Sequence, residues 1–399
     1  MVYASARLAD LQMKGRAAKG MLRRSGMLST PREAEAKAII PPLKRPTAEE
    51  DRIAYRNVGY NLYSDTMTLP TEAMRQAMAQ AVCADEVYEY HTPTIEFQQM
   101  IADLTGKQAA LFMPSGTLSN QLALHLHLLR VGGPASVLCD ERTHVYENES
   151  GGLAYHSRAS AQTIMPSNAH HLTLEEVQKR AILSEDQHYA PTRVISLENT
   201  LSGMIFPQDE IVKISEWAQK HSLKMHLDGA RLWNVAAETG DSMKELCAPF
   251  DTVSLCLSKG LGAPVGSILV GPTDMIERAR KFRKLFGSGM RQIGGLTAAA
   301  HLSVHDTFPQ LRRSHDLAHR CAEMLEMRDI PLTVPCETSM VFFDATAAGY
   351  DAAELESRAA QLEPPIILSC PRLVFHYQVH EDVVERLAAL LDEMKSERD

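Results

Sequence analysis

The sequence predicts an α/β protein that has a large domain built on a mostly parallel sheet and a smaller C-terminal α+β domain. Short apolar runs alternate with helical patterns through the centre of the 399-residue chain, and the alternation stops near residue 300. A chain of this length is also too long for one simple core. We therefore expect an N-terminal extension at residues 1–60, the large domain at 61–300 and the small domain at 301–399.

Seven short apolar runs are the expected strands of the large sheet, because such runs are typical of strands that are buried on both faces. They lie at residues 110–113, 136–139, 163–165, 193–197, 224–227, 252–257 and 267–270. The last run follows its predecessor too closely for a crossover helix, so we expect it to pair antiparallel. An apolar helix is expected from about Thr117 towards Leu129.

Beyond residue 300 the pattern predicts helix, strands and helix. A helical stretch at 311–327 precedes apolar runs at 340–343 and 372–377. A closing helix has one apolar face, which consists of Val383, Val384, Leu387, Leu390, Leu391 and Met394. The cleft between the two domains is the expected binding site.

Composition argues against several classes of protein. A net charge of −9 gives no reason to expect a nucleic-acid partner, and no apolar run approaches the length of a membrane span. Seven scattered cysteines without a Cys-x-x-Cys pair indicate a reducing compartment and no zinc site, and we expect no metal.

The first 45 residues contain ten Lys or Arg and only three acidic residues. We interpret them as part of a peripheral extension of a cytoplasmic protein that is dispensable for catalysis. A mitochondrial presequence is the alternative, but Asp10 and the lack of a clear Arg-rich amphipathic face argue against it.

The most informative pair is Asp228, at the end of one expected strand, and Lys259, at the end of the next. They lie 31 residues apart, about what a strand, a helix and a strand require. A right-handed βαβ unit brings both to the carboxyl edge of the sheet, where ligands bind. An amine beside an acid that can pair with a pyridinium nitrogen suits pyridoxal phosphate (PLP). The alternative is two ordinary strand-end charges.

Three further segments carry compatible chemistry. Ser115, Gly116 and Thr117 join a strand to a helix and offer donors to a phosphate, although such residues are often only helix caps. Arg291 ends a glycine-containing loop and is either a phosphate contact or a surface residue. His144 follows a strand, where an imidazole can stack on a pyridine ring and move protons, but a structural histidine is the alternative.

Together these segments resemble the threonine aldolases of the aminotransferase-like (fold type I) group of PLP enzymes, from Asn61 to about Lys395. The most specific stretches lie at 111–120, 197–200, 226–234 and 256–267. The resemblance implies a mostly parallel seven-stranded sheet flanked by helices, and a homotetramer that binds a small amino acid.

The resemblance also implies roles for individual residues. Lys259 would hold PLP, Asp228 would pair with its ring nitrogen, and His144 would lie over the ring as the first choice of base. Arg231 would lie near the ring's phenolic oxygen and the substrate, and Ser64 and Arg372 would bind the substrate carboxylate. The phosphate would be bound by Ser115, Gly116, Thr117 and Arg291, and in some family members this arginine comes from a neighbouring subunit. The Arg372 fork suits a carboxylate because it can bind two oxygens at once.

The sequence departs from the family pattern at two places. Leu201 stands where many members have a histidine after Glu-Asn-Thr. The stretch at 87–94 lacks the acidic residue that commonly precedes the proline, which makes His91 a second candidate for the hydroxyl end of the substrate.

The expected activity is cleavage of L-threonine, L-allo-threonine and related L-3-hydroxy-α-amino acids to glycine and an aldehyde. A PLP-dependent β-eliminating lyase, an amino acid racemase and a PLP-binding protein without turnover remain alternatives, because fold alone does not determine function.

Overall fold

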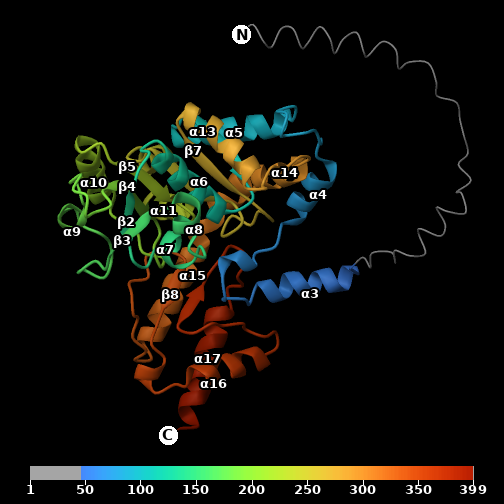
Figure 1. Ribbon diagram of the computed structural model, residues 1–399. Helices are drawn as coiled ribbons and strands as arrows, with labels where there is room; N and C mark the ends of the chain where they lie inside the picture. Colours follow the sequence, from blue (N-terminus) through green and yellow to red (C-terminus); the bar gives the residue numbers. More distant parts are fainter. Residues whose placement is uncertain (1–45, 399) are drawn as a thin grey trace, which may run out of the picture. The chain divides into compact units, whose positions relative to one another are not determined.

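A computed structural model of the protein describes residues 46–398. Residues from Arg52 onward form one unit. This unit contains a seven-stranded sheet and a two-stranded sheet (Figure 1). The expectations for the first 45 residues lie outside the described part of the chain.

The large sheet has the strand order β1-β7-β6-β5-β4-β2-β3. Its strands are β1 (Ala109–Met113), β2 (Ser136–Asp140), β3 (Ser160–Ile164), β4 (Thr192–Glu198), β5 (Lys224–Asp228), β6 (Thr252–Cys256) and β7 (Ser267–Gly271). The pairs from β3 to β6 are parallel, and β7 is antiparallel to both of its neighbours, which confirms the predicted pairing. The run expected at 163–165 was placed too late, because β3 is an edge strand with partly exposed polar residues rather than a continuous apolar run.

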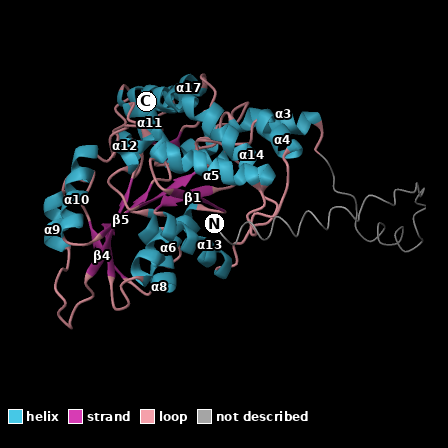
Figure 2. Ribbon diagram, turned by 90° about the horizontal axis from the view of Figure 1, so that it is seen from above, coloured by secondary structure: helices cyan, strands magenta, loops and turns pink. Residues whose placement is uncertain are grey.

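Helices pack on both faces of this sheet. Those of the large domain and its N-terminal lead are α3 (Ala48–Val58), α4 (Glu72–Gln80), α5 (Thr92–Thr105), α6 (Gly116–Leu129), α7 (His144–Glu147), α8 (Gly152–Ser157), α9 (Leu174–Arg180), α10 (Gln208–Lys220), α11 (Leu232–Thr239), α12 (Met243–Cys247), α13 (Thr273–Leu285) and α14 (Gly294–Leu302). Figure 2 shows α6, α8 and α13 on one side of the strands and α5, α11 and α12 on the other.

Alternation along the strands explains this three-layer arrangement. In β1, Leu111 and Met113 pack in the cluster that contains α6 and α13, whereas Phe112 packs in the cluster on the opposite face. Successive side chains of a strand point to opposite faces, so a fully apolar strand needs a helical layer on each side.

The small domain contains α15 (Leu311–Glu326), β8 (Met340–Phe342), α16 (Ala352–Gln361), β9 (Arg372–Val374) and α17 (Val383–Ser396). All six residues predicted for the apolar face of α17 are buried. They form a second core that also takes up Tyr60 and Leu62 from the beginning of the unit. None of the helices in the described part of the chain has the length and apolar character of a membrane span.

The parallel strands β4, β5 and β6 bring functional groups to one edge of the sheet. Glu198 lies opposite Asp228 in the register of β4 and β5, and Asp228 lies opposite Ser254 of β6. Lys259 follows β6 by three residues, so the structure brings the predicted Asp228 and Lys259 pair to the same edge.

Candidate active site

Asp228 is a buried carboxylate at the end of β5. Asn120 of α6 donates a hydrogen bond from Nδ2 to its Oδ2 at 2.7 Å, and the backbone N–H of Ala230 donates to its Oδ1 at 3.0 Å. Both donors are neutral, and each oxygen keeps a lone pair for another donor. A protonated ring nitrogen therefore fits this carboxylate.

His144 is held at the start of α7 by two carboxyl groups. Its backbone N–H donates to Oε2 of Glu198 at 2.7 Å, and its Nδ1 lies 2.8 Å from Oε1 of Glu149. The Glu149 side chain is fully buried and also accepts hydrogen bonds from Asn120 and Gln121. The hydrogen bond with Glu149 raises the pKa of His144 above its ordinary value.

Asn120 links the two halves of this arrangement, because it donates to both Asp228 and Glu149. One ligand atom each from His144, Glu149 and Asp228 lies within 4.8 Å of the others. These donor types also suit a divalent cation. However, amide N–H groups already donate to both carboxylates, and this pattern fits an organic group with its own N–H donor at least as well.

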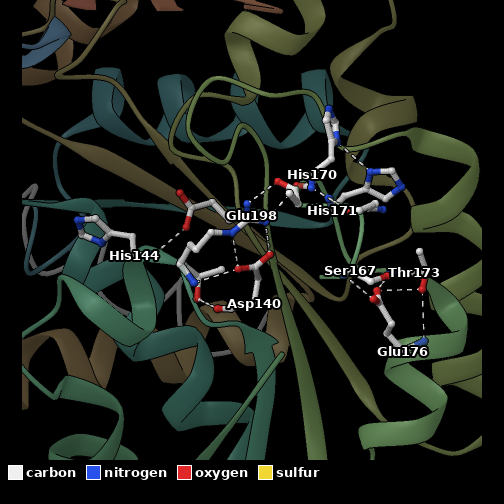
Figure 3. A network of polar contacts seen from close by, with 12 residues as sticks. Asp140, His144, Ser167, His170, His171, Thr173, Glu176 and Glu198 are labelled. Carbon is white, nitrogen blue, oxygen red and sulfur yellow. Dashed lines mark hydrogen bonds and ion pairs between the residues drawn. The ribbon is translucent and has the colours of Figure 1, made fainter. Parts of the chain in front are cut away.

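Glu198 is half-buried beside Asp228. Burial, followed by the negative charge of Asp228, raises the pKa of the Glu198 carboxyl group above its ordinary value. Figure 3 shows Glu198 between His144 and the pair His170 and His171. Two neighbouring carboxyl groups in different environments are a common arrangement in acid–base sites.

Lys259 lies at this edge with its backbone fixed. Thr68 Oγ1 donates to the carbonyl oxygen of Lys259 at 3.0 Å, and the N–H of Gly262 donates to the same oxygen at 2.8 Å. Among the described residues, no hydrogen bond or ion pair engages the side-chain amine. The amine is therefore available to a carbonyl-bearing ligand.

Arg231 binds Asp65 with both branches of its fork, Nε to Oδ2 at 2.8 Å and Nη2 to Oδ1 at 2.7 Å. Burial alone would raise the pKa of Asp65, but the Arg231 charge and hydrogen bonds outweigh it and lower the pKa. Arg372 donates from Nη2 to the carbonyl oxygen of Tyr63 at 3.2 Å. The predicted residues Ser64, Arg231 and Arg372 thus meet around the segment 63–65.

The start of α6 lies close to β6 and carries the predicted phosphate-binding residues Ser115, Gly116 and Thr117. Ser115 caps the helix by accepting a hydrogen bond from the N–H of Leu118 at 3.2 Å, and Ser115 and Thr117 are exposed. A Cβ on Gly116 would lie 2.6 Å from Sγ of Cys256, so only glycine lets the helix start approach β6 this closely. Free helix N-terminal amides and exposed hydroxyls fit a phosphate.

Two predicted residues lie apart from this cluster within one chain. Arg291 binds Asp85 at 2.6 Å and lies over the ring of Tyr88. His91 is almost fully buried, with Nδ1 2.6 Å from Thr94 Oγ1 and Nε2 2.7 Å from the carbonyl oxygen of Val82. Within the described part of the chain, neither residue makes a hydrogen bond or an ion pair with Lys259, Asp228 or the 115–117 turn.

Sequence reasoning did not assign roles to Asp65, Asn120, Glu149 and Glu198. Each lies in or beside one of the segments with candidate site residues, but the residues next to it in the sequence indicate no role for it. One signal existed: Asn120 follows Gly116 by four residues, which places both on one face of a helix. The partners of these four residues come from other elements, so only the folded chain reveals their contacts.

Comparisons with known proteins identify the family to which the chain belongs. A model of the beta-eliminating lyase family matches residues 61–348. The chain is 45% identical to a probable low-specificity L-threonine aldolase of Schizosaccharomyces pombe, covering 82% of this chain and 85% of that protein. It is 42% identical to the low specificity L-threonine aldolase of Saccharomyces cerevisiae, covering 85% and 87%. An alanine racemase of Cochliobolus carbonum is 33% identical, with coverage of 81% and 84%.

A solved structure of Leishmania major threonine aldolase has a TM-score of 0.71 to this chain at 20% identity, covering 84% of this chain and 99% of that one. This likeness confirms the predicted fold type I architecture. The chain therefore belongs to the beta-eliminating lyase family and, within that family of PLP-dependent lyases, to the threonine aldolases.

Proposed function

We propose that the protein is a PLP-dependent aldolase that cleaves L-threonine, L-allo-threonine and related L-3-hydroxy-α-amino acids to glycine and an aldehyde. The observation that carries this proposal is the hydrogen-bonded set of Asp228, Asn120, Glu149 and His144, at the sheet edge where the amine of Lys259 has no hydrogen-bond partner among residues 46–398. The relatives named threonine aldolases support the same reaction.

The chain offers a group for each part of the cofactor. PLP, when bound, supplies an electron sink for the bond that breaks between Cα and Cβ. Lys259 would hold it covalently, and Asp228 would keep its ring nitrogen protonated. The phosphate would lie on Ser115, Gly116 and Thr117, with Arg291 arriving from a neighbouring subunit.

A second set of residues, Arg372, Ser64 and Arg231, would orient the substrate. Arg372 and Ser64 would bind its carboxylate, because the arginine fork can hold two oxygens and Ser64 lies on the segment that Arg372 contacts. Arg231, tied to Asp65, would lie between the cofactor and the substrate. His91 is the second candidate for binding the hydroxyl end of the substrate. This role would require a neighbouring subunit to change the buried hydrogen bonds of His91 with Thr94 and Val82.

His144 would remove the proton from the β-hydroxyl group. Glu149 accepts from Nδ1–H, a tautomer assigned from the hydrogen bond, and this leaves a lone pair on Nε2. Leu201, in the loop that follows β4, would offer an apolar contact at the β-carbon rather than a hydroxyl partner. We therefore expect both L-threonine and L-allo-threonine to be cleaved, because an apolar wall separates hydroxyl configurations weakly.

The test is a product assay. PLP-loaded protein is incubated with L-threonine, L-allo-threonine and L-3-phenylserine, and glycine and aldehyde are measured. Formation of 2-oxobutanoate and ammonia from threonine without glycine would replace this proposal by the elimination reaction.

The racemase among the relatives motivates a second candidate function. The same Lys259 and Asp228 pair would support proton removal from Cα and its return from the other face. Incubation with L-alanine and chiral analysis of the product tests this directly. D-alanine formed at a rate above that of glycine release from threonine would favour racemisation.

We further propose a homotetramer and a cytoplasmic location. Exposed Tyr88, Tyr90 and Tyr155 support an interface with other copies, since aromatic side chains are enriched at such surfaces. Seven free cysteines suit a reducing compartment. We also retain the division into an extension, a domain from residue 61 and a domain from residue 301.

A further inference from the structure

Glu337 of the small domain joins two loops of the large domain. The backbone N–H of Ile205 donates to its Oε2 at 2.6 Å, and Nε2 of His170 lies 2.9 Å from its Oε1. Ile205 belongs to the loop that follows β4, and His170 to the loop that follows β3. Both loops lie at the carboxyl edge of the sheet, so one carboxylate connects them to the small domain.

The loop after β4 is held at both ends. The N–H of Asn199 donates to the carbonyl oxygen of Asp228 at 3.0 Å, and its Oδ1 accepts from the N–H of Phe206 at 3.1 Å. At the tip, Thr338 Oγ1 donates to the carbonyl oxygen of Gly203 at 2.6 Å. Leu201 lies in this loop and is therefore fixed between the strand that carries Asp228 and the small domain.

The loop after β3 is braced by paired histidines. Nδ1 of His170 and Nδ1 of His171 lie 2.8 Å apart, so one must donate and the other accept. If His170 donates from Nε2 to Glu337, then His171 donates from Nδ1. Burial lowers the pKa of His171, which favours its neutral form, and its ring packs against Phe206 of the first loop. Figure 3 shows the two rings together above Glu198.

These loops border the site at the position of Leu201. A cavity with room for about one water molecule is lined by residues of both loops together with Glu198 and Thr143, the residue before His144. On the other side, Glu337 precedes β8 by three residues, and Phe342 of β8 pairs with Arg372 of β9. One segment of the small domain is thus connected to both Leu201 and Arg372.

We propose that Glu337, together with His170, is a positioning residue that sets the relative kcat/KM of the site for different β-substituents and for the two β-hydroxyl configurations. It fixes the distance between the wall formed by Leu201 and the carboxylate-binding Arg372. The groups that would hold PLP and deprotonate the substrate do not contact Glu337. The inference rests on the proposed aldol cleavage and assigns its specificity to a residue outside the reacting groups.

The test compares kcat/KM for L-threonine, L-allo-threonine and L-3-phenylserine in matched variants. Glu337→Ala removes both connections and should change the ratio between these substrates by roughly fivefold or more. Glu337→Gln should stay within about twofold of the wild-type ratio, because its amide oxygen can accept from Ile205 and its NH2 group can donate to the other tautomer of His170. Glu381→Ala is the control, since Glu381 is an exposed small-domain carboxylate that pairs with Arg313 and with no other side chain of the described residues.

A double-mutant cycle separates the network from general damage. His170→Ala should shift the substrate ratio in the wild-type background and add little in Glu337→Ala, because residues of one network are not additive. If Glu337→Ala does not fold, His170→Ala and Thr338→Val must each shift the ratio. A uniform loss for all three substrates, or an unchanged ratio, overturns the proposal.

Hydrogen exchange of the amides at 203–206 provides a readout that needs no substrate. Exchange should be faster in Glu337→Ala than in the wild type and the Glu381→Ala control. Wild-type protein that releases no glycine would refute the proposed function, whereas unchanged exchange in Glu337→Ala would refute the connection itself.

Discussion

Asp228 keeps one lone pair on each oxygen free while accepting hydrogen bonds from Asn120 and Ala230. Replacing it by alanine removes the anion that would hold the ring nitrogen of PLP protonated, so the electron sink weakens. We expect Asp228→Ala to lower kcat by about 100-fold or more, in the range seen when a positioned catalytic group is lost. Steady-state kinetics at saturating PLP check this, and near-normal kcat would eliminate the role.

His144 makes the activity depend on pH. The Glu149 hydrogen bond raises its pKa above 6.5, and a base must be neutral to accept a proton. Activity should therefore fall as the pH drops through this raised pKa. Glu149→Gln removes the negative charge and should move the acidic limb of kcat/KM to lower pH. An unmoved limb in this variant would show that another group controls it.

The variant Arg372→Lys tests whether Arg372 binds the substrate carboxylate. Arg372→Lys keeps the charge but loses the fork, so one charge-assisted hydrogen bond of about 1.5–3 kcal/mol is lost. We expect kcat/KM to fall roughly 10- to 100-fold for every amino acid substrate, with unchanged PLP content measured by absorbance. A change in melting temperature alone would mean that Arg372 only anchors Tyr63.

At the level of elements, the start of α6 depends on its closeness to β6. A Cβ at Gly116 would lie 2.6 Å from Sγ of Cys256, and overpacking of this kind costs about 1–3 kcal/mol. Gly116→Ala should lower the melting temperature and weaken PLP binding, measured by titration. Adding Cys256→Ala should restore much of both, because it removes the clashing atom. Failure of this rescue would place the effect elsewhere.

The elements also show where a local pattern is sufficient. Continuous apolar runs located six of the seven strands, because strands that are covered on both faces must be apolar throughout. The edge strand β3 does not follow this rule, since only one of its residues, the polar Gln162, is buried and Ser160 is exposed. Its position follows from pairing with β2, which is a contact between distant residues.

At the level of the whole molecule, we expect deletion of residues 1–45 and deletion of residues 1–62 to have different effects. Residues up to 45 carry none of the site residues, so their deletion should leave specific activity largely intact. Deletion through Leu62 also removes Tyr60 and Leu62 from the core of the small domain, at about 1.5–3 kcal/mol for each buried side chain. Activity and melting temperature of both truncations check this. Loss of activity in the shorter truncation would show that the extension braces the assembly.

The sequence by itself determined the α/β class, the antiparallel β7, the apolar face of α17 and the meeting of Asp228 with Lys259. These follow from local periodicity and from the topology of a parallel sheet, which brings the carboxyl ends of its strands to one edge. The pairs of Asp228 with Asn120, of His144 with Glu149 and of Arg231 with Asp65 were decided only by the tertiary structure. Their partners lie on different elements, and no periodic pattern encodes the distance between side chains of two packed elements. The connection of Glu337 to Ile205 and His170 depends on packing between the two domains and has no local signal for the same reason.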